Sequence, residues 1–256
     1  METKFKIAKM PDGKPEIFYT LQGEGLFIGL PTIFIRTSTC NLHCVWCDTF
    51  YTWNFEGTKF QKEHKDMPKV KKEDFMMDMT VLEVIKAIND ANPKCKNLVF
   101  TGGEPMIQQK AWIELMKTLR QWNFTPPTWH FQVETNATMP IMPEFLELID
   151  AINCSPKLES SGNEQFLRDT KSFPQYVATP KATFKYVIVE PKDLEEVLAL
   201  ITKYNIPNER VILMPEGRNP QEVMDKSIWL AEICKENGFR FSSRLHVLLW
   251  GAKRAV

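Results

Sequence analysis

The regular alternation of apolar, β-prone runs with amphipathic segments limits the fold of this 256-residue chain most strongly. Most of the segments between the runs are too long for hairpins, so right-handed crossovers should join parallel strands. The predicted strands are residues 31–38, 97–102, 130–136, 151–155, 183–190 and 210–215. We therefore expect an α/β fold, a single domain over residues 1–256 formed by an open or partial βα barrel with about six parallel strands.

Helices are indicated between these strands by apolar residues at helical spacing. One further helix should follow Pro191, and another should end at Gly238, because proline fits the start of a helix and glycine its end. Residues 55–78 are charged and weakly periodic, and we interpret them as an insertion or crossover without a core of its own. The run at 75–79 fits a helix start, a lid or a dimer contact. The predicted core positions on the first two helices are Val81, Val84, Ile85 and Ile88, then Trp112, Leu115, Met116, Leu119 and Trp122.

Charge and composition favour a small-molecule partner over a polymer. Acidic and basic residues balance at 32 each, so the net charge indicates neither nucleic acid nor an anionic membrane as a partner. The N-terminal residues lack a signal-peptide pattern, and no long apolar run is present, so we expect a soluble cytoplasmic protein. In a reducing compartment, six cysteines favour metal binding, redox chemistry or burial over disulfides.

Three of the cysteines, Cys40, Cys44 and Cys47, lie within eight residues in the stretch CNLHCVWC. A structural zinc site needs four ligands, and a thioredoxin-like CxxC would leave Cys40 unused. Three thiolates can instead hold three corners of a 4Fe-4S cluster and leave one iron open for another ligand. The other three cysteines, Cys95, Cys154 and Cys234, have no common spacing and should be buried small hydrophobes.

The CxxxCxxC pattern, with an aromatic residue before its third cysteine, resembles the signature of the radical S-adenosylmethionine (SAM) enzymes. In that family the open iron binds S-adenosylmethionine, and one electron from the cluster produces a 5'-deoxyadenosyl radical that abstracts hydrogen from substrate. The segment Gly102–Pro105 resembles the family's GGEP motif, which contacts the cofactor's amino group. Taken alone, the same four residues would fit a turn into the next helix.

A second resemblance covers nearly the whole chain. LQGEG, PTIFIR, CNLHCVWCDTFYTW, VETNAT, SPKL, LMPEG and the final RLHVLLWGAKRAV are similar to segments of the 7-carboxy-7-deazaguanine synthases. That family contracts the ring of 6-carboxy-5,6,7,8-tetrahydropterin with loss of ammonia, on the route to queuosine and related 7-deazapurines. The resemblance implies a radical SAM carbon–nitrogen lyase.

For the substrate, the resemblance implies a pocket with an amide, a carboxylate and a cation, which suit the edge and the carboxylate of a pterin. Gln22 and Glu24 would bind the pterin edge and Arg36 the carboxylate, with Cys40, Cys44, Cys47, Glu24 and Arg36 as the catalytic set. The predicted substrate contacts are Leu21, Gln22, Gly23, Glu24, Arg36, Thr101 and His246.

For the cofactor, the resemblance implies contacts around the adenosyl and methionyl groups of S-adenosylmethionine. The predicted residues are Trp46, Cys47, Asp48, Gly103, Glu104, Glu134, Asn136, Ser155, Lys157, Met214 and Glu216. Thr49 would hold the Mg²⁺ ion that assists the family, although Asp48 and Thr49 also fit a polar capping loop. The family further implies a homodimer and a reductant such as flavodoxin or ferredoxin.

Two other functions share part of this pattern. A glycyl-radical activating enzyme has CxxxCxxC but acts on a protein and has no use for Gln22, Glu24 and Arg36 together. A non-enzymatic iron–sulfur module would bind a cluster without turnover. Both use fewer of the matched segments than a pterin-contracting enzyme does.

Overall fold

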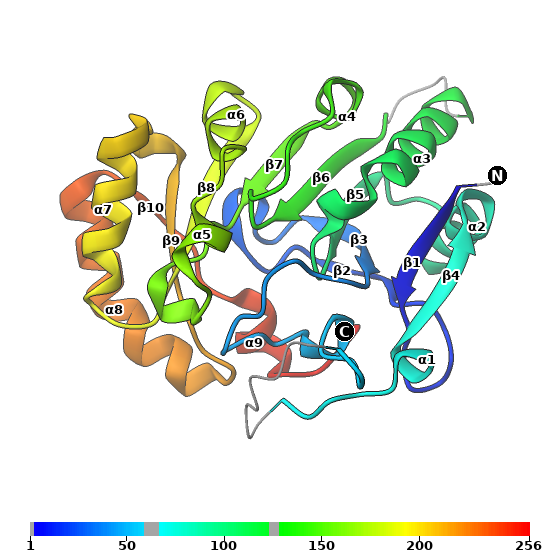
Figure 1. Cartoon of the computed structure of the whole chain (residues 1–256), viewed down its shortest axis with the longest axis horizontal. Helices are drawn as coiled ribbons and strands as arrows, with labels where there is room; N and C mark the ends of the chain where they lie inside the picture. The colour runs from blue at the N-terminus through cyan, green and yellow to red at the C-terminus, as the bar shows by residue number, and fades with distance from the viewer. Residues whose placement is uncertain (1–2, 59–66, 123–127) are drawn as a thin grey trace.

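A computed structural model describes residues 3–58, 67–122 and 128–256 (Figure 1). Its described strands form one open ten-stranded sheet in the order β10-β9-β8-β7-β6-β5-β3-β1-β4, with β2 paired to β3. The run from β3 to β10 is parallel throughout. The strands are β1 (Lys4–Ala8), β2 (Ile17–Leu21), β3 (Pro31–Thr37), β4 (Met76–Thr80), β5 (Asn97–Gly102), β6 (His130–Thr135), β7 (Ala151–Cys154), β8 (Ala182–Ile188), β9 (Val211–Pro215) and β10 (Arg240–Phe241).

The six predicted parallel strands are confirmed as β3 and β5 to β9, and two-residue β10 extends the parallel part. Each ends within two residues of its predicted bounds. The helices are α1 (Lys72–Phe75), α2 (Val81–Ala91), α3 (Gln109–Trp122), α4 (Pro143–Leu148), α5 (Gln165–Arg168), α6 (Phe173–Ala178), α7 (Asp193–Tyr204), α8 (Pro220–Asn237) and α9 (Leu245–Trp250). Short 3-10 turns are η1 (Gly25–Phe27), η2 (Phe50–Thr52), η3 (Pro105–Gln108), η4 (Glu159–Ser161) and η5 (Asn208–Arg210).

Helix α2 shows how local sequence fixes an element. Thr80 accepts from the backbone N–H of Glu83, and the Glu83 carboxylate accepts from that of Thr80, so a capping box starts the helix. The predicted apolar face is buried as expected at Val81, Val84, Ile85 and Ile88. On α3 the same prediction is confirmed for four residues, but it is wrong for Trp122, which is 61 % exposed.

The described part of residues 55–78, which the sequence suggested to be an insertion or crossover, contributes a strand to the sheet and buried side chains. Met76–Thr80 forms β4, which pairs antiparallel with β1 at the edge of the sheet, so the run at 75–79 is mainly a strand. Phe55 and Met67 are buried, at 5 % and 2 % exposure. His64, a lone histidine to which we assign no role, lies outside the described residues.

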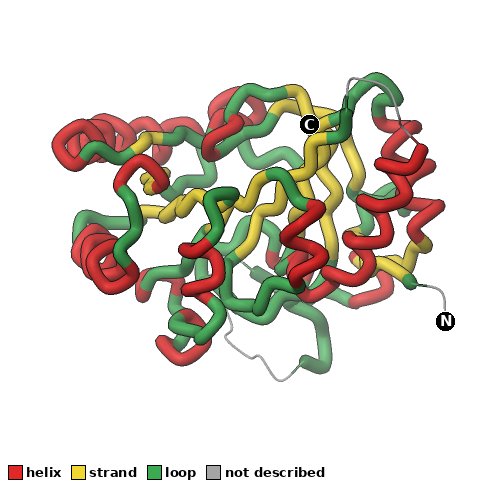
Figure 2. The backbone as a smooth tube through the Cα atoms, turned by 90° about the horizontal axis from the view of Figure 1, so that it is seen from above, coloured by secondary structure: helices red, strands yellow, loops and turns green. Residues whose placement is uncertain are grey.

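Alternation along the strands separates the apolar core from a polar interior. On β6, Phe131 and Val133 join the apolar core, whereas Glu134 faces a cavity. On β8, Phe184 and Tyr186 join the core and Lys185 faces the cavity. Seen from above, helices flank the strands (Figure 2). One face of the parallel sheet therefore builds the core against these helices, and the other presents functional groups.

The C-terminal residues lie on the cavity side of the sheet. Figure 1 shows α9 and the C-terminus on the side opposite α3, α4 and α6, and residues 251–256 line the cavity. Within the described ranges, no helix is long and apolar enough to cross a membrane. Cys95, Cys154 and Cys234 are buried free thiols, as predicted.

Candidate active site

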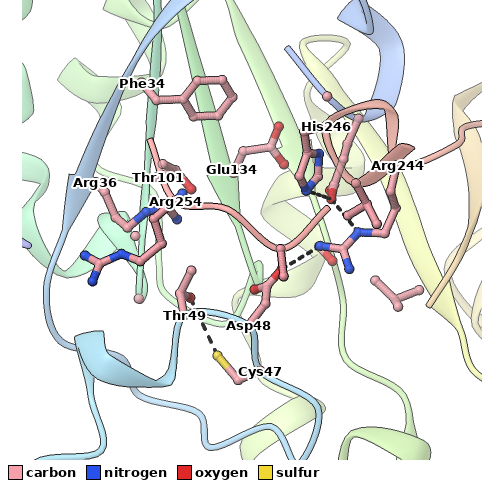
Figure 3. Close-up of a pocket in the computed structure, with 18 of the residues that line it drawn as sticks. Phe34, Arg36, Cys47, Asp48, Thr49, Thr101, Glu134, Arg244, His246 and Arg254 are labelled. Carbon is pink, nitrogen blue, oxygen red and sulfur yellow. Dashed lines mark hydrogen bonds and ion pairs between the residues drawn. The ribbon is translucent and has the colours of Figure 1, made fainter. Parts of the chain in front are cut away.

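A cavity of about 450 Å³ opens at the carboxyl ends of the parallel strands, the usual ligand position in such sheets (Figure 3). Its wall combines the loop before β3 (residues 22–30), the loop after β3 that carries the three cysteines (residues 38–49, the cysteine loop), the ends of β5 to β9 and the C-terminal residues. With the exception of Glu104, the site residues predicted from the sequence all line this cavity. Segments far apart in the chain are therefore brought to one place.

The cysteine loop places Cys40, Cys44 and Cys47 on the cavity wall, each as a free thiol. Every sulfur has a nitrogen donor nearby: the Leu42 N–H at 3.4 Å from Cys40, the Asn163 side-chain amide at 3.2 Å from Cys44 and the Trp53 indole N–H at 3.3 Å from Cys47. Hydrogen bonds of this kind support thiolates that carry iron.

Burial raises the pKa of all three thiols, to about 11 for Cys47. Without a positive ion beside them the thiols stay protonated at neutral pH, whereas bound iron would favour the thiolates. Among the described residues, no His, Cys, Asp or Glu side chains converge in a group of three or more suited to one metal ion. The arrangement fits a cluster, in which each cysteine ligates a different iron.

Residues 160–163 support the cysteine loop from behind, which sequence analysis did not anticipate. Asn163 accepts from the His43 N–H at 2.8 Å, and the Trp46 indole donates to the Ser160 carbonyl at 3.2 Å. A Cβ on Gly162 would lie 2.4 Å from the side chain of Val45. This packing fixes the loop independently of any cofactor.

Gly102 and Gly103 allow the end of β5 to approach the cysteine loop closely. A Cβ on Gly103 would lie 2.1 Å from the carbonyl oxygen of Thr39. At Gly102, where φ is 137°, it would lie 2.0 Å from that of Thr37. Only glycine fits at either position, so the two glycines fit a structural need beside the cavity.

Glu104 lies behind the cavity wall at 0 % exposure. Its carboxylate accepts from the backbone N–H of Asn136 at 2.7 Å, the hydroxyl of Thr135 at 2.7 Å and the N–H of Met106 at 3.0 Å. In this structure it therefore joins the ends of β5 and β6. Asn136 lines the cavity and donates to Asn41 in the cysteine loop at 2.9 Å.

A charged cluster centred on Glu24 occupies part of the cavity wall. Glu24 lies 2.6 Å from the ammonium of Lys185 and 3.1 Å from the Nε of Arg244. Burial opposes ionisation of Glu24, but these two cations outweigh it and lower the pKa of the carboxyl. His246 lies 3.9 Å from Glu24, and burial lowers its pKa. Arg244 also binds Asp48 at 2.5 Å (Figure 3).

Glu134 faces the same cluster from β6. It lies 3.0 Å from Lys185 and accepts from the side-chain amide of Gln22 at 3.1 Å and from that of Asn153 at 3.0 Å. Burial raises the pKa of Glu134 despite the nearby lysine. Gln22, expected at the pterin edge, is thus fixed by Glu134 and is 2 % exposed.

Arg36 has a partner that the sequence did not reveal. Its Nε donates to Glu16 at 2.9 Å, and Glu16 also accepts from Arg254 at 2.6 Å and from the hydroxyl of Tyr51 at 3.0 Å. The expected anionic partner of an inward arginine is therefore partly supplied by the protein. Arg254 lies over the Tyr51 ring, 3.7 Å from its centroid, and helps to fix the C-terminal residues.

The remaining predicted residues are distributed around the wall as expected from their strand ends. Thr49 lies next to the cluster site, with its hydroxyl 3.6 Å from the sulfur of Cys47. Lys157 donates to Ser155 at 2.8 Å, and Glu216 binds Lys226 at 2.8 Å. For Lys185, a lysine inside an apolar strand was a usable sequence signal. Sequence reasoning missed the following lining residues: Glu16, Tyr51, Trp53, Lys185, Arg244 and Arg254.

Comparison with known proteins agrees with this geometry. Residues 34–226 match the Radical SAM superfamily. The chain is 35 % identical to the 7-carboxy-7-deazaguanine synthase of Pyrobaculum aerophilum, covering 93 % of this chain and 95 % of the relative. It is 31 % identical to that of Halobacterium salinarum, covering 92 % and 89 %.

The fold has a solved counterpart in the crystal structure of QueE from Escherichia coli. The TM-score is 0.67 over 95 % of each chain, at 24 % sequence identity. This likeness supports the architecture, and the sequence matches carry the family assignment. The chain therefore belongs to the radical SAM superfamily and, within it, to the 7-carboxy-7-deazaguanine synthase family.

Proposed function

We propose that this chain is a radical SAM lyase that contracts 6-carboxy-5,6,7,8-tetrahydropterin to 7-carboxy-7-deazaguanine with loss of ammonia. The observation that carries the proposal is that one cavity joins the three cysteines to Gln22, Glu24 and Arg36. A cluster-binding module would need only the cysteines. The charged groups opposite them provide a site for a polar heterocycle with a carboxylate.

Cys40, Cys44 and Cys47 would hold a 4Fe-4S cluster that leaves one iron open for S-adenosylmethionine. When bound there, this pair supplies the one-electron chemistry that starts the reaction. The protein's own contribution is to fix the three sulfurs with nearby N–H donors and to enclose them in a cavity.

The cofactor would lie against residues contributed by the cysteine loop and by several strand ends. At this wall the Nζ of Lys157 lies 5.4 Å from the centroid of the Trp46 ring, a cation–π contact. The contact places a flat aromatic surface and a cation side by side. Because Glu104 is buried behind the wall, we assign it an indirect role through the backbone of Asn136. The other proposed contacts are Cys47, Asp48, Gly103, Ser155, Met214 and Glu216.

The substrate would lie between the cysteine loop and the C-terminal residues. Arg36 uses its Nε for Glu16, and its terminal nitrogens would pair with the substrate carboxylate. Glu24 would accept from pterin N–H groups, and Leu21, Gly23, Thr101 and His246 line the same space. We reassign Glu134 from the cofactor to the substrate, because it shares the Lys185 ammonium with Glu24. The low pKa of His246 keeps its imidazole neutral at physiological pH and able to donate or accept a hydrogen bond.

The other parts of the proposal are supported by family resemblance. A Mg²⁺ ion would bind Thr49 and substrate oxygens, since magnesium prefers oxygen ligands and often takes them from the substrate. We include in the proposal a single domain over residues 1–256, a homodimer and a flavodoxin- or ferredoxin-type reductant.

The test is anaerobic reconstitution with iron and sulfide, followed by incubation with S-adenosylmethionine, reductant, magnesium and the pterin. Mass spectrometry should detect 7-carboxy-7-deazaguanine and an equal amount of ammonia. Cleavage of S-adenosylmethionine with unchanged pterin would overturn the substrate assignment but keep the radical SAM assignment. A well-formed cluster without cleavage would support a binding module instead.

A further inference from the structure

Lys185 is a buried cation at the centre of the cavity wall. It lies in the middle of β8 between the core residues Phe184 and Tyr186, and strand alternation turns it to the opposite face. Its side chain is 4 % exposed. Removing an ammonium from water costs several kcal/mol unless it is paired. The charge of a lysine buried in an apolar strand therefore needs anionic partners.

The ammonium bridges two carboxylates from distant parts of the chain. Its Nζ lies 2.6 Å from Oε2 of Glu24, in the loop before β3, and 3.0 Å from Oε2 of Glu134, on β6. These two oxygens can be no farther apart than the sum of the two distances. Two carboxylates so close would repel each other without the cation between them.

The other oxygen of each carboxylate is fixed by neutral or cationic donors. Oε1 of Glu134 accepts from Gln22 and Asn153, and Oε1 of Glu24 accepts from Arg244. An ionised carboxylate has about four acceptor sites, so each retains unfilled ones. Both side chains keep partial exposure, 18 % for Glu24 and 17 % for Glu134, and both line the cavity.

This arrangement suits a ligand edge rich in N–H donors. A reduced pterin presents ring N–H groups and an exocyclic amino group, and carboxylates can accept hydrogen bonds from both. An ammonium has no acceptor, so it could not bind these donors itself. Because Lys185 lies beneath the two carboxylates, it sets their charge and spacing without occupying the ligand's place.

We propose that Lys185 is a positioning residue whose ammonium keeps Glu24 and Glu134 side by side as paired acceptors for the N–H groups of the pterin. The inference rests on the proposed function and extends it to a residue that touches the acceptors instead of the substrate. Its loss should impair pterin binding and leave cofactor cleavage intact.

The neighbouring charges define the expected pH behaviour. The groups facing the two carboxylates are Lys185, Arg244 and His246, and Asp48 lies beyond Arg244. The two carboxylates raise the pKa of Lys185 above its ordinary value, although burial alone would lower it, so the bridge stays charged at neutral pH. Without it, Glu24 and Glu134 share one cation, and the pair should retain a proton to higher pH.

The experiment measures the dissociation constant of 6-carboxytetrahydropterin on reconstituted enzyme with S-adenosylmethionine but without reductant. In Lys185→Met the dissociation constant should rise about tenfold or more at pH 7, the effect of weakening hydrogen bonds to charged acceptors. As pH rises, the dissociation constant of this variant should fall towards that of the wild type, because Glu24 and Glu134 then both become ionised. Lys185→Arg should recover much of the affinity.

Controls separate this role from a general structural one. Lys203→Met removes an exposed lysine that pairs with Asp169 outside the cavity, and it should leave pterin affinity unchanged. Reductant-driven S-adenosylmethionine cleavage without pterin should stay within about twofold of wild type in Lys185→Met, since the cysteine loop is unaltered. If this variant does not fold, Lys185→Gln, which keeps one amide donor, is measured instead.

Wild-type affinity and pH dependence in the lysine variant would overturn the inference, as would equal loss of cofactor cleavage and pterin binding. Failure of the wild-type enzyme to bind or convert the pterin would instead overturn the proposed function. Binding and conversion by wild type together with an unaffected variant would remove only the role of Lys185.

Discussion

The Nε of Arg36 donates to Oε1 of Glu16 at 2.9 Å, and both residues line the cavity together with the C-terminal residues. Glu16 is 1 % exposed and accepts from Arg254 as well. One buried carboxylate therefore orients the proposed substrate ligand Arg36 and the C-terminal residue Arg254. These two residues are therefore structurally coupled.

Arg36→Ala should strongly weaken pterin binding and keep S-adenosylmethionine cleavage. A charge-assisted pair contributes about 1.5–3 kcal/mol, so KM for the pterin should rise about 10- to 100-fold. Steady-state kinetics and a cleavage assay without pterin provide the measurement. Arg120→Ala is the control, because Arg120 pairs with Asp150 away from the cavity. Normal pterin turnover in Arg36→Ala would show that the substrate carboxylate binds elsewhere.

Glu16→Gln should destabilise the fold in a pH-dependent way. Burial raises the pKa of Glu16, but Arg36 and Arg254 outweigh this and hold it below 4.5. A depressed folded-state pKa gives stability that is present above the unfolded value and lost as pH falls through the folded one. The difference in free energy of unfolding should thus be about 3–5 kcal/mol at pH 7 and shrink below pH 4.5.

Denaturant titration at several pH values measures this difference. Glu144→Gln is a matched control, because Glu144 forms an exposed ion pair with Lys117 and should change stability by less than about 1 kcal/mol. A constant difference across pH would mean that the charge of Glu16 does not stabilise the fold.

Cys44→Ala should abolish cluster assembly and all turnover, because a cluster held by two cysteines lacks a required ligand. Iron and sulfide content after anaerobic reconstitution is the measurement. Cys95→Ala should retain the full content, since Cys95 is a buried thiol that does not line the cavity. A full cluster in Cys44→Ala would mean that another residue completes the site.

Gly103→Ala should impair the cofactor site through steric conflict. The added Cβ would lie 2.1 Å from the Thr39 carbonyl, so backbone must shift between β5 and the cysteine loop. S-adenosylmethionine affinity and cluster content should both fall. Gly13→Ala is the control for glycine removal in open space: it carries only the cost of φ near 84°, about 1–2 kcal/mol, and should bind cofactor normally.

The sequence predicted the parallel sheet and most of the cavity because both depend on local patterns. Strand alternation and the apolar faces of α2 and α3 are visible in periodicity, and motifs after parallel strands must meet at one edge. Trp122 was misassigned because it is the last residue of α3. Periodicity predicts which face of a helix is apolar, but not how far along the helix neighbouring elements cover that face. The five-residue strands β1 and β4 pair antiparallel although paired residues such as Ala8 and Met76 are far apart in the chain, which no local pattern reveals.

The charged site residues that sequence reasoning missed share a physical cause. Lys185, Arg244 and Arg254 act as counter-ions, and a counter-ion is defined by a carboxylate far away in the sequence. Glu104 shows the reverse case: its motif predicted a ligand contact, but nearby N–H and hydroxyl donors satisfy it behind the wall. Charge type is readable from sequence, whereas the partner that uses the charge requires the fold.

Trp53→Phe should retain the cluster but make it harder to reduce. The Trp53 indole N–H lies 3.3 Å from the sulfur of Cys47, and such donors favour the more negative, reduced state of an iron–sulfur cluster. Phenylalanine keeps most of the apolar packing and removes the donor, so the midpoint potential should fall. Trp129→Phe is the matched control, because the Trp129 indole nitrogen is buried and has no hydrogen-bond partner among the described residues. An unchanged potential in Trp53→Phe, measured by redox titration, would mean that this contact does not tune the cluster.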